Sequence, residues 1–194
     1  MNRAGSDPGS SANADPANSG GFTSLFNGSS TAGWVNPYDW GHAVATNGEL
    51  RLTSDQKFFL VYEKPYKNFI LQADVLIPPG GKGGLEFRSQ FGHNFTWGYQ
   101  AAVDSRDRDW AGGLWVEGIG WLAHPRHGAP VEPGRWNHYT VEANGDHIQI
   151  WVNGYLTVDV HDSTVSGGYI ALQDHGTKGG SYYFKNILIK DLGG

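Results

Sequence analysis

From Phe22 onward, the chain alternates short apolar runs with Gly, Asn and Pro, a pattern typical of strands separated by turns. No stretch keeps apolar residues at helical spacing for about ten residues, so we expect minimal helix. The absence of a fixed-period repeat argues against a propeller or a β-helix. The pattern therefore predicts an all-β sandwich or barrel. The expected strands are 49–53, 58–62, 69–77, 84–90, 97–104, 114–117, 136–143, 147–152, 156–160, 168–173 and 182–190.

Two Asn-Gly pairs in EANGDHIQIWVNGYLTVDV predict consecutive hairpins. A two-residue loop at Asn144-Gly145 sets Val141 opposite Ile148. At the second turn, a three-residue loop over 153–155 is needed to set Ile150 opposite Val158, because a one-residue slip would turn every side chain over. The predicted core face comprises Tyr139, Val141, Ile148, Ile150, Val152, Leu156, Val158 and Val160, with Thr157 on the opposite face.

The stretch KGGLEFRSQ predicts a strand with two unlike faces. Alternation places Leu85, Phe87 and Ser89 on one face, and Glu86, Arg88 and Gln90 on the other. Three further predicted strands carry polar groups opposite an apolar face. These groups are Gln100 and Asp104 in WGYQAAVD, Trp115 and Glu117 in GGLWVE, and Gln173 and His175 in GYIALQDH.

A solvated sheet face is the ordinary explanation of such alternation. This set is unusual in type, however, because amides, carboxylates, Arg and His replace the usual Lys, Thr and Ser. Trp110, Trp115 and Trp121 are closely spaced among them. Flat aromatic rings suit the C–H faces of sugars, and planar amides or carboxylates suit hydroxyl pairs. The faces therefore predict a carbohydrate site as the alternative to a solvated surface.

Composition narrows the classes of function. The chain has 194 residues, a net charge of −5 and no basic run, which makes nucleic acid an unexpected partner. Its apolar runs are far shorter than the roughly 20 residues of a spanning helix. With no cysteine, thiolate metal sites, Cys nucleophiles and disulfides are excluded.

The first 21 residues, MNRAGSDPGSSANADPANSGG, contain no aromatic or large aliphatic side chain after Met1. Such a segment cannot bury a core, so we expect residues 1–21 to be a disordered linker and 22–194 to form one domain. The linker has the composition expected after a removed export signal. We therefore expect an exported protein that is periplasmic, lipoprotein-anchored or secreted.

Seven segments resemble, in order, the 3-keto-disaccharide hydrolase family: GFTSLFNGSSTAGW, GGLEFRSQ, WGYQAAVD, RDWAGGLWVEGIGWL, GRWNHYTVEANGDHIQIWVNG, GYIALQDH and YFKNILIKDL. The resemblance covers residues 21–192. It implies a concanavalin-A-like jelly roll of two curved antiparallel sheets, with the ligand cleft on a concave face. It also implies an exported bacterial protein that cleaves glycosides previously oxidised at C3. The family's strand motifs fall on Arg88, Gln100, Asp104, Glu117, Gln173 and His175, and Val116 replaces an acidic residue common in the family.

The implied chemistry needs three groups. A ketone at C3 makes the C2 proton acidic, so a base can remove it and the C1 substituent can leave, after which water adds back. Glu117 or His175 is a candidate base or acid. Arg88 is the candidate cation for the enolate oxygen. A divalent metal held by Asp104, Glu117 and His175 is the alternative to Arg88, although the sequence requires no cofactor.

Two functions therefore remain open. The first is cleavage of 3-keto-glycosides or of a related glycan, with Glu117, His175 and Arg88 as catalytic residues. The second is a non-catalytic carbohydrate-binding module of the same fold, a reading favoured by Val116 and by the many Trp residues. Both imply a carbohydrate partner. The predicted substrate-binding residues are Glu86, Gln100, Asp104, Trp110, Trp115, Trp121 and Gln173.

Overall fold

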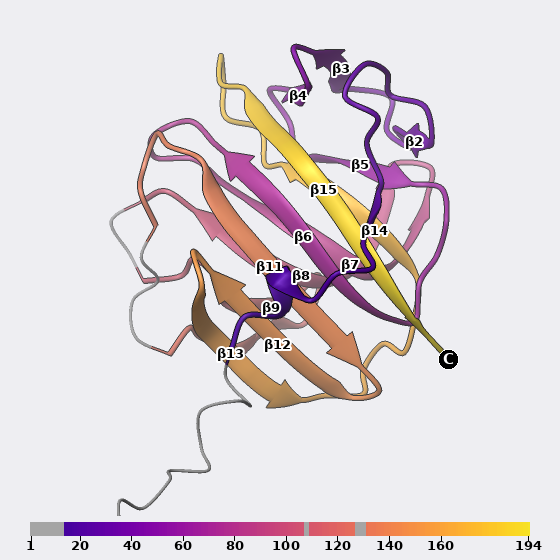
Figure 1. Ribbon diagram of the computed structural model, residues 1–194. Helices are drawn as coiled ribbons and strands as arrows, with labels where there is room; N and C mark the ends of the chain where they lie inside the picture. Colours follow the sequence, from indigo (N-terminus) through magenta and orange to yellow (C-terminus); the bar gives the residue numbers. More distant parts are fainter. Residues whose placement is uncertain (1–13, 107–108, 127–130) are drawn as a thin grey trace, which may run out of the picture.

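The computed structural model describes residues 14–106, 109–126 and 131–194, which form two antiparallel sheets (Figure 1). Eight strands make the first sheet, in the order β13-β12-β11-β6-β15-β4-β3 with β1 beside β15, and seven make the second, in the order β10-β9-β8-β7-β14-β5-β2. The strands are β1 Thr23–Ser24, β2 Trp34–Val35, β3 His42–Thr46, β4 Glu49–Thr53, β5 Phe58–Tyr62, β6 Asn68–Leu76, β7 Lys82–Gly92, β8 Phe95–Asp104, β9 Leu114–Val116, β10 Gly120–Ala123, β11 Asn137–Asn144, β12 His147–Val152, β13 Tyr155–His161, β14 Tyr169–Asp174 and β15 Tyr182–Gly193.

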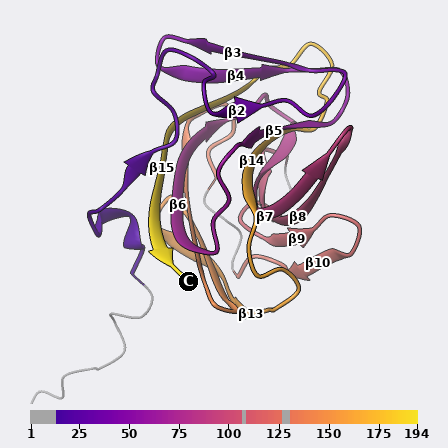
Figure 2. The same ribbon diagram turned by 90° about the vertical axis from the view of Figure 1, so that its right-hand side faces the viewer.

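The two sheets pack as layers, seen from the side in Figure 2. Each strand contributes every second side chain to the space between them, as a period of two requires. Leu85 and Phe87 of β7 and Leu114 of β9 thus share one buried cluster with Val141 and Ile150 of the opposite sheet. The predicted jelly-roll β-sandwich of antiparallel sheets is confirmed.

Helix in the described residues is confined to the single 3-10 turn η1, Pro16–Asn18. This turn lies against β6, where the Nε2 of Gln72 donates a 2.8 Å hydrogen bond to the carbonyl of Ala17. Of the expected linker 1–21, residues 14–21 are described and include η1, while residues 1–13 lie outside the described part. No helix in that part is long and apolar enough to cross a membrane.

Four strands were not predicted. β1 and β2 contain two residues each, too few to show an alternation. In β3 the larger apolar residue, Val44, is 52% exposed, and the half-buried positions are the small Ala43 and Ala45. β10 is half-buried along its whole length, so its sequence has no alternating pattern.

The second Asn-Gly hairpin has the predicted strand pairing but not the predicted three-residue loop. Ile150 lies opposite Val158, as expected. The turn itself has only two residues, however, since Val152 pairs with Tyr155, and the extra residue is a bulge at Thr157. Leu156 therefore lies opposite Trp151, on the face away from the predicted core set, and is only half-buried. The assignment of Leu156 to the core face was wrong.

A second bulge, in β7, reverses the strand's alternation. Arg88 has a φ of 51°, a left-handed value that is uncommon outside glycine, and the pairing with β8 shifts between Phe87 and Gln90. A Cβ placed on Gly98 of β8 would lie 2.5 Å from the Ser89 hydroxyl, so Ser89 lies over Gly98. Gly98 is in phase with Gln100, which places Ser89 on the outer face of the sheet and Arg88 on the opposite one.

Candidate functional site

The outer face of the seven-stranded sheet is hollowed into a cleft of about 360 Å³. Eight of the ten predicted site residues line it, brought together from β8, β9, β10, β14 and their loops. They are joined by Lys57 and Lys82, which the sequence pattern had not singled out. The polar and aromatic lining residues are Lys57, Lys82, Gln100, Asp104, Trp110, Trp115, Glu117, Trp121, Gln173 and His175.

An ion pair between Lys57 and Glu117 lies at the cleft. Lys57 precedes β5 and Glu117 follows β9, and three strands, β8, β7 and β14, separate the two in the sheet. On a flat sheet the four strand spacings would amount to about 19 Å. The Lys57 Nζ nevertheless lies 2.5 Å from the Glu117 Oε1. The cleft face of the sheet is therefore concave.

The alternation of side chains along β5 could have identified Lys57 as a cleft residue. Phe58 and Leu60 face the core, while Phe59 and Val61 belong to a separate apolar cluster on the cleft face. Lys57 lies two residues before Phe59, so its side chain faces the cleft as well. The uninterrupted apolar run FFLVY concealed this alternation, because both faces of β5 are buried.

His175 is held as a neutral imidazole. It lines the cleft one residue beyond β14, and its Nδ1 is buried with no hydrogen-bond partner among the described residues. Burial lowers the pKa of His175 to about 4, and the nearby positive charges of Lys82 and Lys57 act in the same direction. At neutral pH this ring can accept a proton or a hydrogen bond, and it carries no proton to release as an acid.

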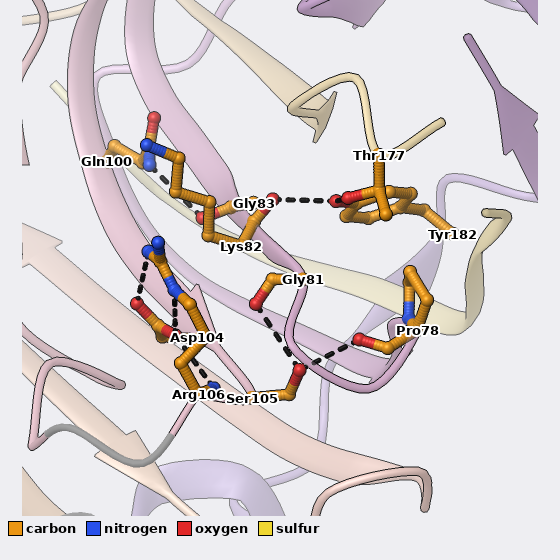
Figure 3. Close-up of polar contacts among 10 residues, drawn as sticks. All are labelled: Pro78, Gly81, Lys82, Gly83, Gln100, Asp104, Ser105, Arg106, Thr177 and Tyr182. Carbon is orange, nitrogen blue, oxygen red and sulfur yellow. Dashed lines mark hydrogen bonds and ion pairs between the residues drawn. The ribbon is translucent and has the colours of Figure 1, made fainter. Parts of the chain in front are cut away.

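Two amide side chains form the floor of the cleft, Gln100 (8% exposed) and Gln173 (3% exposed). The Nε2 of Gln100 donates a 3.2 Å hydrogen bond to the carbonyl of Gly83, as drawn in Figure 3. A Cβ on Gly84 would lie 2.3 Å from the Cγ of Gln100. Glycine at position 84 is therefore required for Gln100 to lie flat across β7.

Asp104 has a protein partner of its own. Arg106 binds it through two contacts, Nε to Oδ1 at 3.0 Å and Nη2 to Oδ2 at 2.9 Å (Figure 3). The Asp104 side chain is only 4% exposed, so this pair forms a fixed end of the cleft. A paired fork of this kind is a strong, oriented contact.

Three tryptophans form one wall. Trp121 packs edge-on against Trp115 with ring centroids 5.2 Å apart, and against Trp110 at 5.4 Å. A Cβ on Gly113 would lie 2.7 Å from the Trp121 ring, so a glycine there allows this close approach. All three rings are half-buried and so keep part of their surface open. The wall offers the flat apolar surface on which a sugar ring can stack.

Arg88 does not reach the cleft, and its predicted placement beside Gln100, Glu117 and His175 is wrong. Its side chain is 1% exposed and donates to the carbonyls of Lys67 at 2.9 Å and Val165 at 3.2 Å. The bulge is the physical reason, because it turns this residue to the other face of β7. The guanidinium therefore fastens two loops and is not available as the cation of the site. Gln90 is displaced in the same way, with its Nε2 donating to the carbonyl of Gly167.

Glu86 lies on the cleft face but does not line the cleft. It pairs across the sheet with Gln100 and Ala171, yet it is 0% exposed, and neither carboxyl oxygen has a hydrogen-bond partner among the described residues. Burial raises the pKa of Glu86 well above its usual range and the charge of Glu117 raises it further, against opposing effects of the Ser89 hydroxyl and the Lys57 charge. The buried surroundings of Glu86 therefore favour its neutral, protonated form.

Two of the three candidate metal ligands are paired with cationic side chains in the structure. Asp104 is engaged by Arg106, and Glu117 by Lys57. Across the described ranges, no three His, Asp or Glu side chains are grouped so that they could hold a metal ion.

Residues 21–190 match the family of 3-keto-alpha-glucoside-1,2-lyase-like domains. The chain therefore belongs to this family, as its motifs indicated. The family and the relatives described next indicate a glycan-related role.

A levanase from Bacillus subtilis (strain 168) is 29% identical over 122 residues, which amount to 61% of this chain and 18% of the levanase. The chain thus matches only a small part of that relative. The fold is similar to that of the carbohydrate-binding module CBM66 from Bacillus subtilis, with a TM-score of 0.68 and 24% identity over 85% of this chain and 98% of that one. It also resembles a Parabacteroides distasonis protein proposed to be a glycosyl hydrolase, with a TM-score of 0.70 and 22% identity over 89% and 94% of the two chains.

Proposed function

We propose that the protein cleaves 3-keto-glycosides by eliminating the C1 substituent, with Glu117 as the base and Lys57 as the cation. The observation that carries this proposal is the 2.5 Å contact between the two side chains at the cleft. The reaction needs a base at C2 and a positive charge at the oxygen on C3, and C2 and C3 are adjacent carbons of the sugar. A carboxylate and an ammonium in contact match that demand.

The proposed reaction runs in two steps. The Glu117 carboxylate takes the proton from C2, and the C2–H electron pair forms an enolate whose charge lies on the C3 oxygen, next to Lys57. The enolate then re-forms the C3 ketone, a C1–C2 double bond forms, and the C1–O bond breaks. The departing oxygen takes up a proton. No oxidant or cofactor is consumed, and hydration of the unsaturated sugar completes net hydrolysis.

The rest of the cleft supports sugar binding. The tryptophan wall offers stacking surface, and the amides of Gln100 and Gln173 offer donors and acceptors for hydroxyl groups. The neutral His175 ring is suited to accept a hydrogen bond from a hydroxyl. In this proposal Lys57 takes the role that the sequence had suggested for Arg88.

The test is turnover of a 3-keto-glucoside by wild type and by Glu117→Gln. The substitution keeps the shape of the side chain and removes the base, so turnover should fall by about a hundredfold or more while binding of the substrate persists. Glu142→Gln, on the other sheet, is the matched control. Unchanged turnover in Glu117→Gln would overturn the assignment of the base.

A second candidate function is carbohydrate binding without catalysis. It is favoured by the similarity to CBM66, since 98% of that module is covered. A binding module would show no turnover in wild type and would lose glycan affinity mainly when Trp115 or Trp121 is replaced by Ala. An aromatic contact contributes about 1 kcal/mol of binding free energy beyond the effect of its buried area. With that area included, we expect replacement of either ring to lower the glycan affinity by about tenfold or more.

A further inference from the structure

The elimination needs an acid for the departing oxygen, and the carboxylates and imidazole lining the cleft do not supply one. His175 is neutral, Glu117 accepts from Lys57, and Asp104 accepts from Arg106. Lys57 is placed beside the base and is assigned to the enolate oxygen. Among the described residues, two further proton carriers near the cleft are Lys82 and the buried carboxyl of Glu86.

Glu86 is a costly residue to bury where it stands. Both its oxygens lack a partner within the described residues, and its side chain is 0% exposed. Its cross-strand neighbours are Gln100, which lines the cleft, and Ala171, which belongs to an apolar cluster. An unpartnered buried polar group destabilises a fold, and a structural role would be filled better by an apolar side chain. A functional role accounts for its presence.

We propose that Glu86 is the general acid of the site, which protonates the departing glycosidic oxygen while Glu117 accepts the C2 proton. This assignment rests on the proposed function. Two neighbouring carboxyl groups in different surroundings can divide the roles of acid and base, because Glu86 is fully buried and Glu117 lies against the Lys57 ammonium.

The proton balance of the cycle closes within this pair. The Glu86 O–H bond breaks as the leaving oxygen gains the proton, so the aglycone departs as a neutral alcohol. At the same time Glu117 holds the proton taken from C2. Passage of that proton from Glu117 to Glu86 restores the starting state, with no co-reactant.

In this proposal, opening of the Lys57–Glu117 ion pair gives the sugar access to Glu86. The charged and titratable groups that act on Glu86 are Glu117 and Lys57, and Tyr38 is in turn affected by Glu86. The Lys57 side chain is 38% exposed, so it can turn away. When the sugar engages Glu117 and draws Lys57 to the C3 oxygen, the contact that spans the sheet opens, and the Glu86 carboxyl can meet the glycosidic oxygen.

The experiment compares two substrates that differ only in the leaving group. Methyl 3-keto-glucoside releases methanol, which needs a proton as it leaves, whereas 4-nitrophenyl 3-keto-glucoside releases a phenolate, which does not. Glu86→Gln should lower kcat/KM on the methyl substrate by about 100-fold or more and on the nitrophenyl substrate by less than about 10-fold. Glu117→Gln should lower both equally, and Glu142→Gln neither.

A second measurement covers the case in which C2 deprotonation limits the rate. In D2O, recovered methyl substrate should show more deuterium at C2 per product formed with Glu86→Gln than with wild type, because the enolate forms and returns. If neither this ratio nor the leaving-group dependence changes, Glu86 is not the acid. If Lys82→Met shows the leaving-group dependence instead, Lys82 is the acid and the assignment is overturned. A wild type inactive on both substrates overturns the lyase proposal, and the acid with it.

Discussion

Lys57 and Glu117 meet at 2.5 Å across a sheet in which three strands separate them. The contact joins the start of β5 to the end of β9 over the concave face. It therefore bridges the two sides of the cleft. A ligand that engages either partner must compete with this ion pair.

Replacing Lys57 by Met tests the effect of the Lys57 charge on catalysis and on stability. The variant keeps the apolar stem of the side chain and loses the charge, so the enolate loses its cation. We expect turnover of a 3-keto-glucoside to fall by about 10² to 10³-fold. The half-exposed ion pair itself contributes little to stability, about 1 kcal/mol or less. Steady-state kinetics and chemical denaturation check the two expectations, and full activity in Lys57→Met would contradict the role of the cation.

Arg88→Lys should affect stability and spare catalysis. The planar guanidinium reaches the carbonyls of Lys67 and Val165 together, and a single ammonium cannot replace that geometry. We expect the free energy of unfolding to fall by about 2–4 kcal/mol, with kcat per folded molecule unchanged. Arg126→Lys, at an exposed residue, is the control. A loss of kcat without a loss of stability would return Arg88 to the catalytic site.

The bulge at Thr157 predicts that two neighbouring substitutions both destabilise the protein. Ile150→Ala leaves a cavity in the core and should cost about 2–5 kcal/mol. Thr157 is 1% exposed, and its single O–H lies within hydrogen-bond distance of the carbonyls of Gly112 (2.8 Å) and Ile150 (3.0 Å). Thr157→Val should therefore cost about 1–3 kcal/mol, unlike the small effect expected for a solvated face. Denaturant unfolding measures both, with the exposed Ser163→Ala as control.

Asp174 and His175 should give opposite pH dependences of stability. Burial raises the pKa of Asp174 from 3.8 to about 6, so its contribution to stability is present at low pH and is lost as pH rises from about 4 to 6. Burial lowers the pKa of His175 from 6.5 to about 4, so its contribution is lost as pH falls from about 6.5 to 4.

Two variants distinguish the pH dependence of stability due to Asp174 from that due to His175. The stability of Asp174→Asn relative to wild type should increase with rising pH across this window, and that of His175→Gln should increase with falling pH. Unfolding measured in steps from pH 4 to 7 gives both differences. Parallel curves for wild type and either variant would show that the residue concerned does not titrate in this range.

The sequence predicted the cleft where strands keep a regular period. Gln100, Glu117 and Gln173 were placed correctly because β8, β9 and β14 alternate without interruption up to those residues. Arg88 was misplaced because its left-handed backbone falls on a residue other than glycine, and nothing in the local sequence marks the bulge. Lys57 was missed because β5 is apolar on both faces, so its sequence does not show which residues face the cleft. The burial of Glu86 depends on residues far away in the chain.

The phase reversal in β7 also shapes how this strand tolerates substitution. Before Arg88, even-numbered positions face the cleft and odd-numbered positions the core; after it, Ser89 takes the cleft side and Gln90 the other. Saturation mutagenesis along residues 82–92 would then show tolerant and intolerant positions in alternation on each side of Arg88, with odd and even positions exchanged after it. Deletion of Arg88 would restore one regular alternation, because Ser89 would then follow Phe87 on the opposite face, and every side chain beyond it would keep its present face.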